Sequence, residues 1–571
     1  MAGEDEVRKI ARKYALKNAF DFGKADQQSV LGKVVPLAKG TDVSTARGIV
    51  EEQVSIVNGM SKEEIGMEYK KFEKEFEKKA KETVERTAAP NLTIEGAEMG
   101  KVVTRISPAP SGYMHIGHVK QALLSEQVSK IYHGKFYRYF DDTDPEQCRQ
   151  EYVDAMMKDH EWLGMKFDKT YYASDHVEKM YEYAKLLING GRAYTCMCSR
   201  DVMKEKRFSG EECEHRKQRP DDNMRLFGKM LDGELHEGDA TVRFMGDMKA
   251  QNTVMRDPVI LRVSEAPHYR VGRRYRVWPT YEFNTPIVDS LNGITDIIRS
   301  KEYELRDEES RAILKALGLR VPRMHLEARL NIKGNITQKR DIRKLIEEGR
   351  LQGWDDPRLL TIMALRRRGI TALAIRNFVL RLGMTKTDSV VPMEMLLAEN
   401  KKMIDPIAKH LYFVPEPVKL VVKGRQTSRA KLKLHPTNDD GFREYETKET
   451  FYISKDDAAN VEEGAVLRLK DFADVKLLEK GKTITAQNAE GKNGKIVQWV
   501  SEGNCINCTV LIPLPILDGE GNFNPNSLRK VSGFVEGYAE KLKEREIVQF
   551  ERFGYCILDE KKGMQFIFIS K

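Results

Sequence analysis

The chain has 571 residues, which is more than one hydrophobic core supports, so we expect several domains. Lys and Arg number 96 against 87 Asp and Glu, and the net charge of +9 indicates a polyanionic partner, the alternative being a charge-rich solvated surface. No apolar run is long enough to cross a bilayer and no signal-peptide core is present, which predicts a cytoplasmic protein with no membrane partner. The 7 cysteines, an odd number, argue against a disulfide framework.

Residues 1–97 are expected to form a helical N-terminal extension, ending in a Lys/Glu-rich helix for which Ser61 and Glu64 provide a capping box. Apolar side chains recur on one face of that helix: Ile65, Tyr69, Phe72 and Phe76. We therefore expect a helix that either docks on the protein or binds a partner protein. The segment carries no recognisable catalytic motif.

The next part of the chain alternates short apolar strands with helices. The predicted strands are 101–106, 135–140, 294–300 and 324–332. Helices are expected to begin near Ile116 and Glu146. This alternation predicts a parallel sheet with crossover helices, a Rossmann-like catalytic domain made of 98–191 and 272–337. An inserted domain at 192–271 interrupts it.

The C-terminal half changes character twice. Helices are expected over 338–406, a connecting domain with a proline break at 354–358 and a basic run at 366–368. From 407 to 571, segments such as 465–472 alternate apolar and charged residues between Gly, Asn and Asp turns. That pattern predicts an all-β region of antiparallel barrels.

One stretch, TRISPAPSGYMHIGHVKQALLS at 104–125, places two histidines at the start of a helix. A strand, a turn and a helix N-terminus gather backbone N–H groups and the positive end of the helix dipole, which suits phosphate. His115 and His118 could donate hydrogen bonds to phosphate oxygens there, an electrostatic contribution rather than a nucleophilic one. The alternative is an ordinary turn. The chain has no Walker A sequence, so ATP would be held in another way.

The segment SGYMHIGHVKQ resembles the HIGH signature of class I aminoacyl-tRNA synthetases, in the form used by glutamyl and glutaminyl enzymes. Further segments agree with that family in order and spacing: 139-YFDDTDPEQ-147, 278-WPTYEFNTPIVDSLNGITDIIRS-300 and 353-GWDDPRLLTIMALRRRGI-370. The helical extension and the all-β C-terminal part resemble archaeal glutamyl-tRNA synthetases. The best candidate for the second signature, KMSKS, is 335-NITQKRD-341, in which Gln338 replaces the serine.

The resemblance implies the residues of the active site. The catalytic residues would be His115, His118 and Lys339. ATP would lie against Pro108, His115, Gly117, His118, Lys339 and Arg340. Glutamate would be bound by Arg105, Ser107, Asp141, Tyr281 and Arg299. These roles suit the side chains, because a lysine can follow charge onto the leaving pyrophosphate and the planar fork of arginine pairs with carboxylates.

The reaction implied is the attachment of L-glutamate to tRNA(Glu), with ATP and Mg²⁺, through glutamyl-adenylate and with release of AMP and pyrophosphate. tRNA(Gln) is allowed as a second acceptor. The insert would bind the acceptor stem and the β region the anticodon, with phosphates contacted by basic residues such as 366–368.

Two other functions stay open at this point. A glutaminyl-tRNA synthetase would share the GYMHIGH-type motif, although DTDP at 142–145 favours the glutamyl enzymes. A non-catalytic tRNA-binding paralogue is suggested by the altered loop at 335–340.

The insert carries a pattern typical of a structural metal site. Its ligands would be Cys196, Cys198, Cys213 and His215. Cysteines one residue apart on a strand point to the same face, and three thiolates with an imidazole suit zinc. The alternative is two reduced pairs without metal. Cys505 and Cys508 have no second pair nearby and are expected to sit unliganded on a β-hairpin.

Overall fold

The structure, a computed structural model, describes residues 4–35, 42–61, 63–72, 92–490 and 494–571. It divides into two compact units, Met1–Ala89 and Pro90–Lys571, which we describe separately.

The described part of the first unit is helical, as expected. Its helical stretches are α1 (Glu4–Phe22), α2 (Gln27–Val34), α3 (Val43–Asn58) and residues 63–72. The predicted capping box is present, because Ser61 N–H donates to the Glu64 carboxylate at 2.8 Å and Glu64 N–H donates to Ser61 Oγ at 3.3 Å. Ile65 is buried in the unit's core and Phe72 packs against it, so this apolar face docks within the unit. Phe76 lies outside the described residues.

The second unit contains the predicted parallel strands. Two of them, β1 (Val103–Ile106) and β2 (Lys135–Phe140), form a sheet with a third strand that was not predicted, β3 (Lys169–Tyr172). The helices between them are α5 (Ile116–Ile131) and α6 (Gln150–Trp162). The first helix begins at the predicted residue, whereas the second begins at Gln150 rather than Glu146, because Glu146 N–H donates to the Asp144 side chain in a turn.

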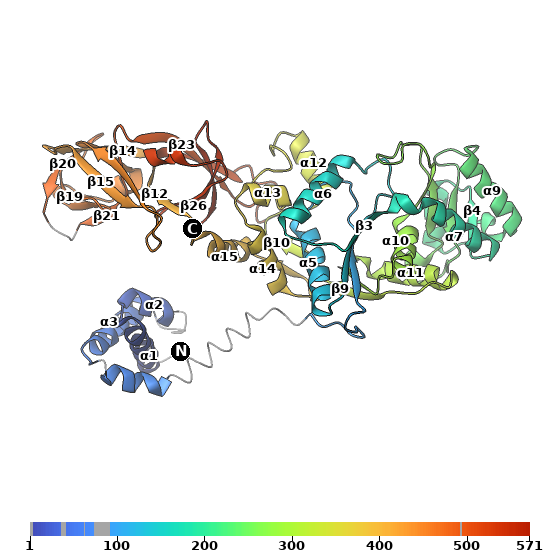
Figure 1. Cartoon of the computed structure of the whole chain (residues 1–571), viewed down its shortest axis with the longest axis horizontal. Coiled ribbons are helices and arrows are strands. Elements are labelled where there is room, and N and C mark those ends of the chain that lie inside the picture. Colours follow the sequence, from blue (N-terminus) through green and yellow to red (C-terminus); the bar gives the residue numbers. More distant parts are fainter. Residues whose placement is uncertain (1–3, 36–41, 62, 73–91, 491–493) are drawn as a thin grey trace. The chain divides into compact units, whose positions relative to one another are not determined.

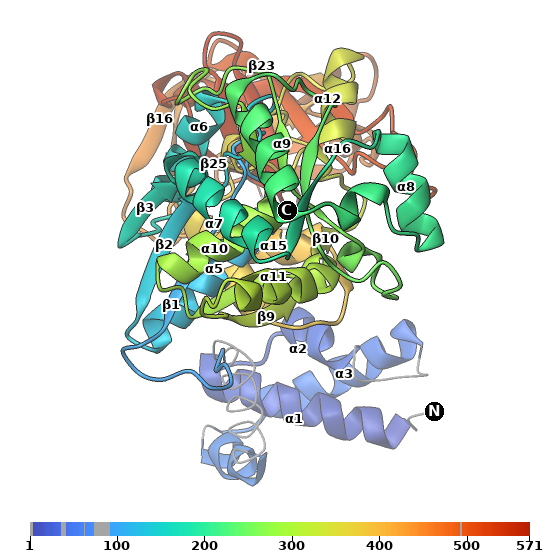
Figure 2. The same ribbon diagram turned by 90° about the vertical axis from the view of Figure 1, so that its right-hand side faces the viewer.

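Two further parallel strands, β8 (Asp296–Ser300) and β9 (Arg323–Glu327), continue this layer beside β1. The Thr295 N–H donates to the Val103 carbonyl at 2.9 Å, which joins β8 to β1. The chain order therefore reverses between β1 and β8, and the carboxyl ends of these two strands flank the crevice where parallel α/β sheets bind ligands. Helices α10 (Tyr281–Leu291) and α11 (Glu304–Ala316) run side by side in the same region (Figure 2).

The single strand predicted over 324–332 is wrong, because the structure breaks it in two. After β9 the backbone leaves the sheet at Ala328, whose N–H donates to Thr385 and whose carbonyl accepts a hydrogen bond from Lys120 Nζ at 2.6 Å. The second piece, β10 (Leu330–Ile332), pairs instead with β11 (Ser389–Val391). This crossing leads the chain out of the parallel layer just before the predicted second signature.

The insert is a small antiparallel sheet with two helices. The strands follow the order β4 (Ala193–Cys196), β5 (Thr241–Phe244), β6 (Val259–Val263) and β7 (Val277–Pro279). The helices are α8 (Arg200–Ser209) and α9 (Pro220–Asp232). Because β7 pairs with β6, the sheet of the insert continues past residue 271 and leads directly into α10.

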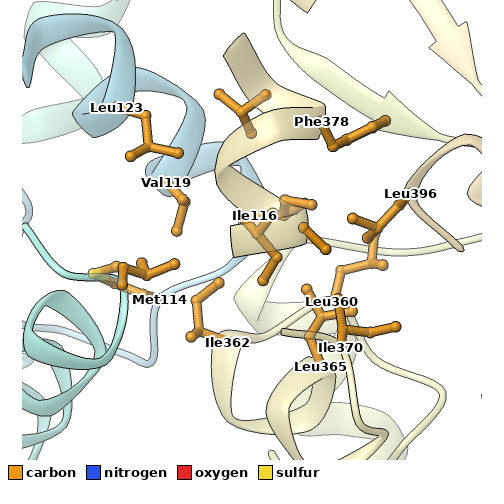
Figure 3. Close-up of a cluster of buried hydrophobic side chains, with 14 of the residues drawn as sticks. Met114, Ile116, Val119, Leu123, Leu360, Ile362, Leu365, Ile370, Phe378 and Leu396 are labelled. Carbon is orange, nitrogen blue, oxygen red and sulfur yellow. The ribbon is translucent and has the colours of Figure 1, made fainter. Parts of the chain in front are cut away.

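The connecting segment is helical with one short strand, β11. Its helices are α12 (Lys339–Glu347), α13 (Ile362–Arg367), α14 (Ala372–Leu382) and α15 (Met393–Ile404). One buried apolar cluster joins α13, α14 and α15 to α5. Figure 3 shows Ile116 on α5 facing Leu360 and Ile370, with Phe378 and Leu396 beside them. The cluster extends to β-region residues such as Ile569, so the helix that starts at the histidine motif is anchored in a core shared with the C-terminal half.

The described part of the C-terminal region consists of strands apart from a short helix, α16 (Lys455–Ala459), and a 3₁₀ turn, η5 (Gly537–Lys541). One sheet has the order β12 (Lys409–Leu411), β25 (Ile547–Phe550), β26 (Gly554–Glu560), β27 (Gln565–Ser570), β23 (Cys505–Pro513), β24 (Leu528–Glu536) and β13 (Phe413–Pro415). A second has the order β21 (Lys495–Val497), β18 (Val466–Leu469), β19 (Ala473–Glu479), β20 (Ile484–Ala489), β14 (Pro417–Lys423), β17 (Thr450–Ser454) and β22 (Val500–Ser501). A separate ribbon pairs β15 (Ser428–Lys433) with β16 (Phe442–Thr447). Figure 1 shows these strands in orange and red.

The expected closed barrels are found as two open sheets. In each sheet the two edge strands are consecutive in the chain, with Tyr412 between β12 and β13 and Trp499 within the link between β21 and β22. At Tyr412 the backbone N–H donates to the buried Glu536 carboxylate at 2.6 Å instead of to a neighbouring strand. The chain therefore passes from one edge to the other covalently, and no hydrogen-bonded ladder joins those edges in the described residues.

Candidate active site and metal centre

The histidine turn is held in place by the segment that contains the proline break. Met114 accepts a hydrogen bond from Ile362 N–H at 2.9 Å, and Ile116 N–H donates to the Leu360 carbonyl at 3.1 Å. His115 forms an isolated antiparallel bridge with Thr361 between these bonds. Two segments of the predicted family pattern, far apart in sequence, are thus fastened together backbone to backbone.

The two histidines cap the helix that they begin. His115 Nδ1 accepts from Gly117 N–H at 3.1 Å, and His118 Nδ1 accepts from His115 N–H at 3.3 Å. Burial and the nearby Lys339 lower the pKa of His115 to about 4, and burial holds the pKa of His118 well below its usual value. Both imidazoles are therefore neutral at pH 7, with the ring proton on Nε2. Each is a donor to a ligand rather than a cation.

Lys339, the first residue of α12, reaches back to the same loop. Its Nζ donates to Ser111 Oγ at 3.0 Å, and burial lowers the pKa of the ammonium. A Cβ added to Gly112 would lie 2.8 Å from Lys339 Cδ, so the glycine leaves the space that the lysine stem occupies. Arg340, by contrast, points outward with 90% of its side chain exposed and pairs with Asp341.

A cavity of about 210 Å³ lies between these elements. The predicted residues that line it are Ser107, Pro108, His118, Asp141, Tyr281, Arg299 and Lys339. They come from the ends of β1, β2 and β8 and from the starts of α5, α10 and α12. The structure thus brings most of the predicted site residues to one cavity. His115 and Gly117 stay at the adjoining helix cap, and Arg340 is not part of the lining.

The two predicted glutamate-binding arginines are both buried and differ in position. Arg299 lines the cavity, pairs with Asp307 and donates to the Tyr303 carbonyl at 3.4 Å. Arg105 is only 1% exposed and does not line the cavity. Its guanidinium makes a two-point pair with the carboxylate of Asp289, on α10.

Asp141 supplies the carboxylate of the cavity wall. Burial raises its pKa to about 7, although Thr143 Oγ1 donates to Asp141 Oδ1 at 3.0 Å and opposes that shift. The backbone of Asp141 is tied to the first loop, because its N–H donates to the Pro108 carbonyl at 3.1 Å. The side chain is therefore on the edge of ionisation near pH 7, where a cationic ligand group would favour the charged form.

Some lining residues were not predicted. His160, on α6, has both ring nitrogens without a hydrogen-bond partner among the described residues, and burial lowers its pKa to about 3. Gln121 and Tyr303 also line the cavity. No motif marks His160 in the sequence, where it reads as one polar residue in an amphipathic helix.

The four predicted metal ligands lie together in the insert. Their ligand atoms are all within 4.8 Å of one another, and no other such group occurs in the described residues. Cys196 Sγ lies 3.8 Å from Cys213 Sγ, and His215 Nδ1 lies 3.4 Å from Cys198 Sγ. A tetrahedral zinc with its usual bond lengths would separate sulfur from sulfur by about 3.8 Å and sulfur from nitrogen by about 3.5 Å. The donor set therefore fits zinc.

The local backbone of this metal centre differs from the expectation. Only Cys196 is on a strand, because β4 ends there and Cys198 follows in a loop. Cys213 and His215 belong to the short 3₁₀ turn η2 (Glu214–Lys217) and its N-cap. Asp257 holds this turn against the sheet, since it accepts from Arg216 Nε at 3.0 Å. Cys505 and Cys508 lie on β23, paired with β24, away from this group.

The comparisons with known proteins identify the family. The catalytic-domain model of the class I tRNA synthetases (E and Q) matches residues 101–406, and two models of anti-codon binding domains of the same class match 408–492 and 496–559. The chain is 40% identical to the glutamate–tRNA ligase of Nitrosopumilus maritimus, over the full length of both proteins. It is also 40% identical to the glutamate–tRNA ligase of Pyrococcus furiosus, over 97% of this chain and 98% of the relative.

Among solved structures, the glutamate-tRNA synthetase from Elizabethkingia anophelis resembles 54% of this chain and 71% of its own, at 19% identity and a TM-score of 0.41. No described helix is both long and apolar enough to span a membrane. The full-length relatives and the three matched models agree, and the chain belongs to the class I tRNA synthetases of the E and Q family, with a catalytic domain followed by anticodon-binding domains.

Proposed function

We propose that this enzyme attaches L-glutamate to tRNA(Glu), with ATP as the second substrate. The relatives that match the whole chain at 40% identity are glutamate–tRNA ligases, and a cavity at the carboxyl ends of β1 and β8 contains the groups this reaction needs. That cavity is the observation on which the proposal depends. The glutamate carboxylate would attack the α-phosphorus of ATP, and the glutamyl group would then pass to the terminal ribose of the tRNA.

The ATP side of the site would be formed by neutral donors and one lysine. Because both Nδ1 atoms are used in capping, His115 and His118 can offer only Nε2–H to phosphate oxygens. Such fixed donors stabilise charge as it develops on the phosphate, without any reorganisation of the site. Lys339 would follow the charge onto pyrophosphate. Its pKa is lowered because burial disfavours the charged ammonium, and the negative charge of the phosphates would offset that cost. Pro108 and Gly117 would let ATP approach the backbone closely.

Glutamate would be held by groups of opposite character at its two ends. Arg299 and Arg105 would face carboxylates, whereas Asp141 would face the ammonium group and Tyr281 would close the cavity wall. Ser107 adds a hydroxyl at the end of β1. A site built to pair carboxylates with buried arginines would reject glutamine, because an amide leaves the guanidinium unpaired.

Metal ions would have two separate roles. Mg²⁺ would arrive with ATP and would neutralise charge on the triphosphate. Among the described residues, Asp141 is the only one that brings a carboxylate to the cavity lining. Cys196, Cys198, Cys213 and His215 would hold structural zinc, which would fasten the end of β4 to η2. The zinc would thus shape the insert and take no part in the chemistry.

The tRNA would contact the domains on either side of the catalytic strands. We assign anticodon binding to the β region, in line with the two anti-codon binding models matched there, and acceptor-stem binding to the insert. Of the basic run, Arg367 pairs with Asp559 and Arg368 is buried with its Nη2 directed to the Ile569 carbonyl. Those two arginines therefore serve the fold, which leaves Arg366 as the phosphate contact of that run.

The first test is ATP–pyrophosphate exchange with tRNA present. We expect exchange that depends on glutamate, because His118, Lys339 and Arg299 meet at one cavity. A non-catalytic tRNA-binding protein would bind tRNA and show no exchange. Glutaminyl-tRNA synthetase, the alternative enzyme, would show exchange that depends on glutamine instead.

A further inference from the structure

Arg105 is held by one carboxylate in a part of the molecule that water does not reach. Its Nε donates to Asp289 Oδ1 at 3.0 Å and its Nη2 donates to Asp289 Oδ2 at 2.8 Å. The arginine side chain is 1% exposed and the aspartate side chain is 0% exposed. Removing the carboxylate would leave a buried charge without a partner, so the pair links β1 to α10 strongly.

The pair leaves part of the guanidinium free. Nη1 of Arg105 is buried and has no hydrogen-bond partner among the described residues. A guanidinium is planar, so a carboxylate that holds Nε and Nη2 also fixes the direction in which Nη1 and the second Nη2 hydrogen point. A buried donor left unpaired costs free energy, and a ligand carboxylate would satisfy it.

The Arg105–Asp289 pair lies on elements that form the cavity. Arg105 directly precedes Ile106 and Ser107 in the chain, and Asp289 lies on α10, the helix that begins at Tyr281. Ile106, Ser107 and Tyr281 all line the cavity, so both members of the pair are fixed to segments of its wall. Burial lowers the pKa of Arg299, which also lines the cavity, and the positive charge of Arg105 adds to that shift. The hydroxyl of Tyr171 is likewise buried without a hydrogen-bond partner among the described residues.

We infer that Asp289 is a positioning residue for amino-acid recognition: it orients Arg105 so that its Nη1 edge meets a carboxylate of the bound glutamate. Asp289 touches no substrate atom itself. It keeps the guanidinium charged and still in the empty enzyme, so that glutamate meets a donor already in place. This inference rests on the proposed function, because it assigns a role in binding the amino acid.

The test compares Asp289→Asn with a matched variant elsewhere in the chain. Arg443 and Glu536 form a second buried pair in the β region, also 1% and 0% exposed, in which Arg443 Nε donates to both carboxylate oxygens of Glu536. Glu536→Gln therefore makes the same chemical change at the same burial, away from the cavity. For each variant we would measure the melting temperature, the KM for glutamate, the KM for ATP and the charging ratio of glutamate to glutamine, at saturating tRNA.

We expect Asp289→Asn to raise the KM for glutamate by roughly 10- to 100-fold, the value of a charge-assisted hydrogen bond, and to lower the preference for glutamate over glutamine. The KM for ATP should change by less than about twofold on this account, and Asp289→Glu should restore part of the loss. Glu536→Gln should lower the melting temperature and leave the KM for glutamate unchanged. Equal melting losses in Asp289→Asn and Glu536→Gln, with wild-type glutamate KM in both, would overturn the inference.

Arg105→Lys provides a second test in case Asp289→Asn does not fold. This variant keeps the positive charge and removes the planar fork of the guanidinium. It should raise the KM for glutamate, and adding Asp289→Asn to it should raise that KM no further, since Asp289 acts through Arg105. Independent, additive effects would overturn the inference. Failure of the proposed function would appear earlier, as a wild-type enzyme that charges no glutamate.

Discussion

Lys339 Nζ lies 3.0 Å from Ser111 Oγ, so the start of α12 closes over the loop that precedes the histidines. The two residues are 228 positions apart in the chain. The contact joins the altered second signature to the first one, and it does so although Gln338 stands where the family usually has serine. The lysine alone makes this connection, because Arg340 faces solvent.

Gly112→Ala should displace the lysine. The new Cβ would lie 2.8 Å from Lys339 Cδ, so the side chain must move. We expect adenylate formation to slow by about tenfold or more, as for a misplaced catalytic group, while the melting temperature stays near that of the wild type. Gly228→Ala, in α9 with open space around its Cβ, is the matched control and should have full activity. The rate of adenylate formation is measured for both variants in the pre-steady state. Equal rates in Gly112→Ala and Gly228→Ala would contradict the importance of the Lys339–Ser111 contact.

His118→Ala should affect chemistry far more than tRNA binding. It removes an Nε2–H donor and one capping bond to His115 N–H. The expected loss of kcat is about 100- to 1,000-fold, as for other fixed donors to a developing charge, against a capping loss of about 1 kcal/mol in stability. Single-turnover rates measure the effect on chemistry, and filter binding measures the effect on tRNA affinity. If both fell in proportion, His118 would have a folding role instead.

The acidity of Asp141 predicts how activity and stability depend on pH. Since burial raises its pKa to about 7, its negative charge is lost as the pH falls through 7 and the KM for glutamate should then rise. The folded state also binds this proton more tightly than the unfolded chain. The free energy of unfolding that this carboxyl contributes therefore decreases as the pH rises from about 4 to about 7. Asp141→Asn should raise the KM, flatten its pH dependence and raise the melting temperature at pH 8. A wild-type KM for glutamate that is constant from about pH 6 to pH 8 would argue against the assignment.

The sequence predicted what is local and missed what depends on long-range packing. The helix start at Ile116 follows from the local pattern of residues, and it is present in the structure. The same is true of the Cys-x-Cys and Cys-x-His spacings, whose four side chains form one group in the insert. The break at Ala328 was missed, because it depends on a hydrogen bond from Lys120, some 208 positions away. The apolar pattern on either side of Ala328 is continuous, so no local pattern marks the residue at which the chain leaves the sheet.

The same limit applies to the site. The family pattern singled out Arg105 as a glutamate-binding residue, yet it could not show that Asp289 already occupies two of its nitrogens, because Asp289 follows an apolar run inside a helix. His160 was missed for a similar reason. The opening of the expected barrels into two sheets was missed too, since it depends on the direction of the Tyr412 N–H and on no residue pattern.

The metal centre predicts one zinc per chain by elemental analysis. Cys196→Ser should abolish that zinc and loosen the insert, which limited proteolysis between β4 and β5 would reveal. Cys505→Ser is the control, because Cys505 lies on β23 outside the cluster, and it should retain the zinc. Zinc-free wild-type protein with an intact insert would show that the four residues form a reduced thiol cluster.

The most direct test of the whole account is charging of tRNA(Glu) by the purified enzyme, with ATP and either glutamate or glutamine as the amino acid. In the proposed site Arg299, which lines the cavity, and the buried Arg105 pair with the carboxylates of the amino acid, so we predict that glutamate is attached and glutamine is not. Attachment of glutamine alone would contradict the account, as would an enzyme that binds the tRNA and charges neither amino acid.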